Sequence, residues 1–175
     1  MAGTLKHTLD KVTDVVGGTA GKMNASAVTS ADSFLENATI GNRYEIEAAR
    51  VALKRSASEP IKLFAQKMIL DHTTAKHQMS SALEMSETKG VTTPPQTLDT
   101  RRETMLKHLV EAPNGSFDST YVDQQVLAHE ETETLMRTYA HSGDNPQLRS
   151  VALGTLPVVQ RHLRHAKMLK EQHAA

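Results

Sequence analysis

The sequence predicts an all-α fold in which four long helices form an antiparallel bundle. Aromatic residues make up only 3 % of the 175 residues, while Ala, Leu, Met, Lys and Glu are plentiful, which favours helix over sheet. Four long stretches place apolar residues at intervals of three and four, as the buried face of a helix requires. The links within two pairs of these stretches are short, so each pair should be antiparallel.

The first pair of helices occupies the N-terminal half of the chain. Thr29 or Ser30 can cap the first helix, which ends before the segment 56–60. The second helix covers 61–83, opens after a proline that suits a first turn, and ends by Gly90.

The second pair follows a short connecting helix predicted over 98–110. A third long helix is expected over 117–140, and Asp144 is expected to cap the last one, with Pro146 in its first turn. Pro157 lies inside this last helix and should kink it.

Residues 1–29 are predicted to form an amphipathic segment and a flexible linker, and residues 30–172 the bundle domain. Apolar residues from Leu5 to Val16 have helical spacing, and Gly17, Gly18 and Gly21 should then break the helix. Residues 4–16 could contact the bundle, a partner protein or a membrane surface, or could be a frayed terminus.

Composition excludes several classes of function. Lys plus Arg equals Asp plus Glu at 20 each, so no nucleic-acid partner is expected. The chain has no cysteine, which excludes disulfides and thiolate metal sites. No apolar run reaches membrane-spanning length. Asp10, Lys11 and Asp14 interrupt the continuous apolar core that a signal peptide needs, so a cytoplasmic location is expected.

Each long helix carries a titratable residue within its apolar stripe: Glu45, His72, His129 and His162. Counted from the turn of the first hairpin, Glu45 and His72 should lie at nearly the same height. His129 and His162 should be offset by about 7 Å at the rise of an α-helix, unless the kink at Pro157 or a shifted helix start absorbs it. Four such residues on four helices predict one polar site in the bundle core.

Three imidazoles and one carboxylate suit Zn, Fe, Mn, Cu or Ni, with zinc or iron expected first. Asp71, Glu133 and His165 would be additional ligands or hydrogen-bond partners of the ligands. The alternative is a non-enzymatic stress or interaction protein in which these residues form a structural hydrogen-bond network. No motif places a serine nucleophile, so catalytic residues stay unknown.

Several stretches of the sequence together match one family pattern over about 30–169. They are Ala31–Leu35, Tyr44–Glu47, Phe64–Thr73, Tyr121-Val122 with His129, and Leu156-Pro157 with His162-Leu163. In these stretches the sequence resembles the bacterial ferritin-like domain-of-unknown-function family 4142. The resemblance implies a ferritin-type four-helix bundle with the four core residues at the family's polar positions.

The resemblance implies little about activity. Ferritin-type di-iron sites use Glu-x-x-His pairs, and no glutamate stands three residues before His72, His129, His162 or His165. A mononuclear or histidine-rich site therefore fits better than a di-iron site. If the protein is an enzyme, we expect a metal-dependent oxidoreductase with an open coordination position. Many family members look exported, whereas this chain does not, so their location is not carried over.

Overall fold

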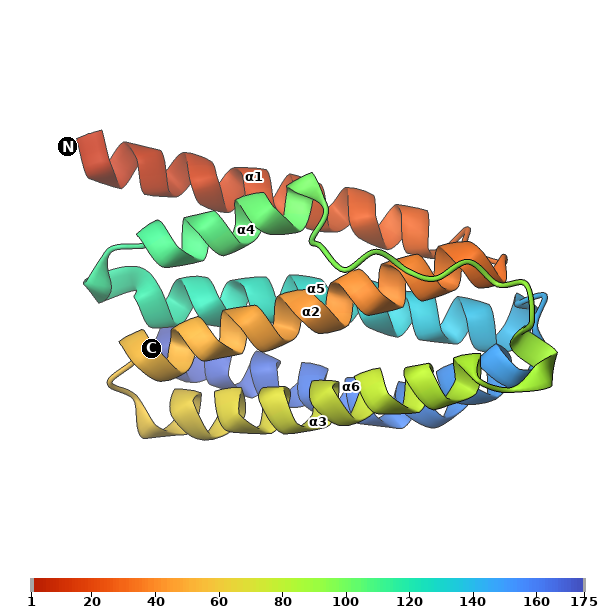
Figure 1. The fold of residues 1–175 in the computed structure, drawn as a ribbon. Coiled ribbons are helices and arrows are strands. Elements are labelled where there is room, and N and C mark those ends of the chain that lie inside the picture. Colours follow the sequence, from red (N-terminus) through yellow and green to blue (C-terminus); the bar gives the residue numbers. More distant parts are fainter. Residues whose placement is uncertain (1, 175) are drawn as a thin grey trace.

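A computed structural model describes residues 2–174, with side chains described for residues 5–172, and this part of the chain is all-helical (Figure 1). It contains no strand, which confirms that the fold is all-α. None of its helices is long and apolar enough to cross a membrane. The helices are α1 (Ala2–Ala25), α2 (Ala31–Arg55), α3 (Glu59–Leu83), α4 (Thr100–Glu111), α5 (Phe117–Ser142) and α6 (Pro146–Ala174), with 3₁₀ turns η1 (Ser86–Thr88) and η2 (Asn114–Ser116).

Helices α2, α3, α6 and α5 pack in a closed ring in which each contacts the next. Two tight connections make α2–α3 and α5–α6 antiparallel hairpins. A long connection, which begins with η1, then runs back from the end of α3 along the molecule to α4, as Figure 1 shows. Helix α4 contacts α2 and α5, and α1 lies outside, against α5 and α4.

Local sequence signals set most helix ends. Ser30 caps α2, and its side chain accepts a hydrogen bond from the Ser33 backbone N–H at 3.3 Å. The prediction that Asp144 caps the last helix is wrong. The Asn145 side chain accepts a hydrogen bond from the Leu148 N–H at 3.0 Å, while Asp144 accepts one from the Tyr139 hydroxyl.

The predicted break at the glycines of α1 is also wrong, because the helix continues to Ala25. These glycines lie on the face of α1 that packs against its neighbours. A Cβ at Gly18 would meet the Leu127 side chain at 3.1 Å, and a Cβ at Gly21 would collide with the Glu131 carboxyl group of α5. Glycine therefore serves close helix packing here, which outweighs its poor helix propensity.

Polar side chains hold α1 in place. Asp14 is only 5 % exposed, and it accepts hydrogen bonds from Gln124 Nε2 and His108 Nδ1, both at 2.7 Å. Gln124 in turn accepts a hydrogen bond from the Tyr44 hydroxyl at 2.9 Å. Burial raises the pKa of Asp14 above its usual value, although these two hydrogen bonds oppose the shift.

The buried apolar residues form two clusters, one at each end of the helix ring. Each helix of the ring contributes residues to both clusters, and a buried polar residue lies near the point where one cluster ends and the other begins. In α3, for example, Met68 belongs to the first cluster and Met79 to the second, with His72 between them. A polar layer thus lies at mid-height, closed off from both ends by apolar side chains.

We expect Gly21→Ala to lower the free energy of unfolding by about 1–3 kcal/mol, because the added methyl group would lie 2.7 Å from Glu131 Cδ and 2.8 Å from Arg101 Nη2. Gly154→Ala in α6 is the matched control, since a Cβ there meets nothing within 4 Å and should stabilise by about 1 kcal/mol. Urea denaturation of both variants checks this. Equal stabilisation by both alanines would contradict the close packing of α1.

Candidate metal centre

The polar layer brings together three of the predicted site residues: His72 from α3, His129 from α5 and His162 from α6. All three are at most 5 % exposed. Their ring centroids lie between 5.4 and 5.7 Å apart, so each ring contacts both others. Helix α6 begins only at Pro146, and this later start removes part of the height difference expected between His129 and His162.

One nitrogen of each ring has a hydrogen-bond partner within the chain. A neutral imidazole has one N–H donor and one lone pair, so each of these acceptors takes the N–H and selects the tautomer. The bonds run from His72 Nδ1 to Asn42 Oδ1 at 2.8 Å, from His129 Nδ1 to the Gln125 carbonyl oxygen at 2.8 Å, and from His162 Nε2 to Asp71 Oδ2 at 2.7 Å.

The other nitrogens are His72 Nε2, His129 Nε2 and His162 Nδ1, and none has a hydrogen-bond partner among the described residues. Each ring offers one nitrogen, and the three offered nitrogens lie within 4.8 Å of one another. We infer that these are the nitrogens without a partner, so that three lone pairs face a common point. Zinc–nitrogen bonds are about 2.0–2.1 Å long, so small ring movements would bring the three atoms around one ion. The three buried histidines could hold a metal ion.

The surroundings keep His72 and His162 neutral, which is the state a metal requires of a ligand imidazole. Burial lowers the pKa of His72 well below its usual value, and the neighbouring His129 and His162 add to the shift. Burial also lowers the pKa of His162 to about 4, with a further contribution from His129. The hydrogen bond to Asp71 opposes this shift only in part.

Glu45 lies beside the three rings but on the far side of His129. Its Oε1 atom is 3.5 Å from His129 Nδ1, whereas the free nitrogen of that ring is Nε2. Its Oε2 atom accepts a hydrogen bond from Gln125 Nε2 at 2.6 Å. Burial raises the pKa of Glu45, although the charge interaction with His129 opposes the shift. The structure does not bring this carboxylate to the point where the three nitrogens converge.

The three additional residues named from the sequence lie in different places. Asp71 accepts the His162 hydrogen bond and also pairs with Lys67 at 2.9 Å. Burial raises the pKa of Asp71, but these two partners more than offset it, so the net shift is downward. Glu133 interacts with Arg137 and with Gln160 Nε2, and His165 packs its ring edge-on against Phe64. Neither belongs to the group of three.

Sequence reasoning missed Asn42 and Gln125, which position the site without being titratable. A signal for each was present. Asn42 precedes Glu45 by three residues and Gln125 precedes His129 by four, so each shares a helix face with a predicted site residue.

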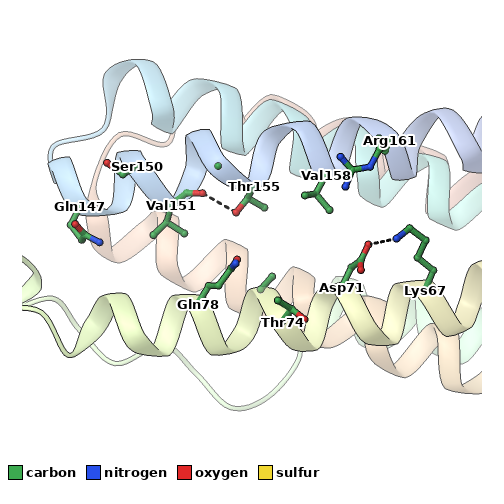
Figure 2. A pocket seen from close by; sticks show the side chains of 12 residues that line it. Lys67, Asp71, Thr74, Gln78, Gln147, Ser150, Val151, Thr155, Val158 and Arg161 are labelled. Carbon is green, nitrogen blue, oxygen red and sulfur yellow. Dashed lines mark hydrogen bonds and ion pairs between the residues drawn. The ribbon is translucent and has the colours of Figure 1, made fainter.

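A small cavity of about 20 Å³ lies next to the rings. Its walls include His72 and His162 and the apolar side chains of Met136 and Val159. This volume suffices for about one water-sized ligand. On the outer side, a groove of about 460 Å³ lies between α3 and α6. Figure 2 shows Asp71 near one end of it, paired with Lys67 on α3, with Arg161 on α6 across from it. Asp71 lines both spaces and so stands between solvent and the site.

The low pKa of His162 predicts acid sensitivity of the metal-free protein. An unfolded histidine titrates near 6.5, so between about pH 6.5 and 4 the unfolded state binds more protons. The stabilisation from neutral His162 is therefore present above that range and lost as pH falls through it, by about 3 kcal/mol. Denaturation in a chelator across this range checks this. His162→Gln should flatten the dependence, and the exposed-site control His77→Gln should not. An unchanged slope in His162→Gln would contradict the assignment.

Comparison with known proteins gives a family but no activity. Neither a curated protein nor a solved structure matches the chain at a significant level. The family model described as "Domain of unknown function (DUF4142)" matches residues 17–169, which include all of α2 to α5 and the three histidines. The match covers most of the chain, and the chain therefore belongs to this family of domains of unknown function.

Proposed function

We propose that the protein binds a transition metal ion through His72 Nε2, His129 Nε2 and His162 Nδ1. The observation that carries the proposal is the convergence of these three buried atoms, none of which has another partner among the described residues. A purely structural hydrogen-bond network would instead pair buried nitrogens with acceptors or donors, because leaving them unpaired costs about 1–3 kcal/mol each. Three neutral imidazoles are a known ligand set for zinc, and imidazole is also a suitable ligand for iron.

The fold proposed for this function is a four-helix bundle of ferritin type, made of α2, α3, α5 and α6. The closed ring of contacts among these helices supports it. The donor set differs from that of a di-iron centre, which takes several carboxylates. With three protein ligands the ion would be mononuclear and would keep one position open, and the small cavity beside the rings offers room for a water-sized fourth ligand.

The hydrogen-bond acceptors behind the rings have a role of their own in this proposal. Asn42, the Gln125 carbonyl and Asp71 would hold each ring in the tautomer and orientation that directs its lone pair inward. We assign Glu45 neither to these acceptors nor to the ligands, because its Oε1 lies 3.5 Å from the Nδ1 side of His129, whose N–H is taken by the Gln125 carbonyl.

Protein purified without chelator should contain about one transition metal ion per chain, and His72→Ala should lose it, because two imidazoles alone hold an ion weakly. Elemental analysis of both proteins is the measurement. His77→Ala is the matched control, since this histidine lies five residues further along the same helix and is exposed. Only trace metal in the wild-type protein, with no uptake of added Zn²⁺ or Fe²⁺, would refute the proposal.

Asp71→Asn should weaken metal affinity about 10- to 100-fold, because the variant replaces the carboxylate that accepts the His162 N–H. Competition with a chromogenic chelator measures the change. Glu133→Gln is the control, since Glu133 contacts Arg137 and Gln160 instead of a ligand ring. Equal losses of affinity in both variants would mean that Asp71 has no specific role.

A further inference from the structure

Helix α1 has an inverted amphipathic character. The face that packs on α4 and α5 carries Asp14 and the glycines, which are buried or half-buried, and its attachment depends on hydrogen bonds and close backbone approach. The opposite face is apolar, and its side chains are between 52 and 69 % exposed. They are Leu5, Leu9, Val12, Val15, Val16 and Met23. We call this set the outer stripe.

The outer stripe has the spacing of a helix–helix seam. All members but Val15 follow alternating intervals of four and three residues, and the exposed polar residue Thr19 occupies the remaining position of this series. Val15 lies beside the series, next to Val16. The series is Leu5, Leu9, Val12, Val16, Thr19 and Met23. This is the a/d repeat by which two helices pack side by side. The stripe runs for about 27 Å along α1 at a rise of about 1.5 Å per residue. Exposed apolar side chains elsewhere, such as Leu153, are not arranged in this way.

Charges on α1 argue against a lipid surface as the partner. Helices that lie on anionic membranes present free lysines and arginines beside their apolar face. Every lysine of α1 is already paired with a carboxylate of the same chain. Lys6 pairs with Asp10 and Glu111, Lys11 with Asp123, and Lys22 with Glu130. The outer stripe itself carries no ionisable residue, so its complement is another uncharged apolar stripe.

We propose that the outer stripe is a dimer interface that pairs with the outer stripe of a second copy of this chain. An uncharged seam is complementary to itself, which a two-fold symmetric interface requires. The formal net charge of the chain is zero, so the two copies do not repel each other. The hydrogen bonds that hold α1 against α5 present the stripe already ordered, which lowers the entropic cost of association. The inference does not depend on the histidine site.

Sedimentation velocity of the full chain over a range of concentrations tests the pairing. The wild-type protein should sediment as a dimer that dissociates on dilution. Leu9→Glu should raise the dissociation constant about 100-fold or more, because a two-fold interface would bury two unpaired charges. Leu153→Glu is the matched control, because Leu153 is 64 % exposed and Leu9 is 58 % exposed, and Leu153 lies outside the stripe. This substitution should leave the dimer unchanged. Far-UV circular dichroism verifies that both variants stay helical.

Cysteine crosslinking gives a second test that needs no charged substitution. The chain has no cysteine, so Val12→Cys introduces a single thiol in the outer stripe. A short bismaleimide should crosslink Val12→Cys into a covalent dimer and leave Leu153→Cys without a covalent crosslink. Monomeric wild-type protein at all concentrations, without crosslinking, would overturn the proposal. Monomeric protein that co-sediments with vesicles of phosphatidylcholine and phosphatidylglycerol would also overturn it, in favour of a lipid partner.

Discussion

The hydrogen bond from each buried imidazole to an acceptor behind it is the interaction on which the centre of the molecule depends. A neutral ring that donates its N–H in one direction must direct its lone pair in the opposite direction. Asn42, the Gln125 carbonyl and Asp71 surround the three rings, so the three lone pairs meet in the middle. The two apolar clusters then close this layer from both ends, and this burial lowers the pKa of His72 and of His162.

The attachment of α1 obeys a different rule from the packing of the helix ring. In the ring, apolar stripes face one another and polar residues are the exception. Helix α1 instead turns its polar and glycine-rich face inward, where Asp14 meets Gln124 and His108, and Gly21 lies against Glu131. The Glu131 carboxylate is itself held by Arg101 and Arg102, so this junction is a network of charged and polar groups.

The long helices and the burial of the three histidines could be predicted from the sequence, because both depend on periodicity along one chain. The role of Glu45 could not be predicted in the same way. Stripe membership places its side chain in the core, but which side of the His129 ring it meets depends on how α2 and α5 are rotated against each other. The glycines of α1 could not be interpreted from the sequence for the same reason. Glycine in a helical pattern predicts a helix break, and its role in close packing becomes visible only when the side chain packed against it is known, here Leu127 or Glu131.

The long connection between α3 and α4 divides the chain into two hairpins, and the polar layer is shared between them. His72 and its acceptor Asn42 belong to the first hairpin, whereas His129 and His162 belong to the second. Asp71 of the first hairpin accepts its hydrogen bond from His162 of the second. Neither hairpin alone contains a complete set of converging nitrogens. An ion bound there would take ligands from both hairpins and so hold together two hairpins whose covalent link is a long segment. Two fragments cut within that segment would therefore reassemble more tightly when the ion is supplied.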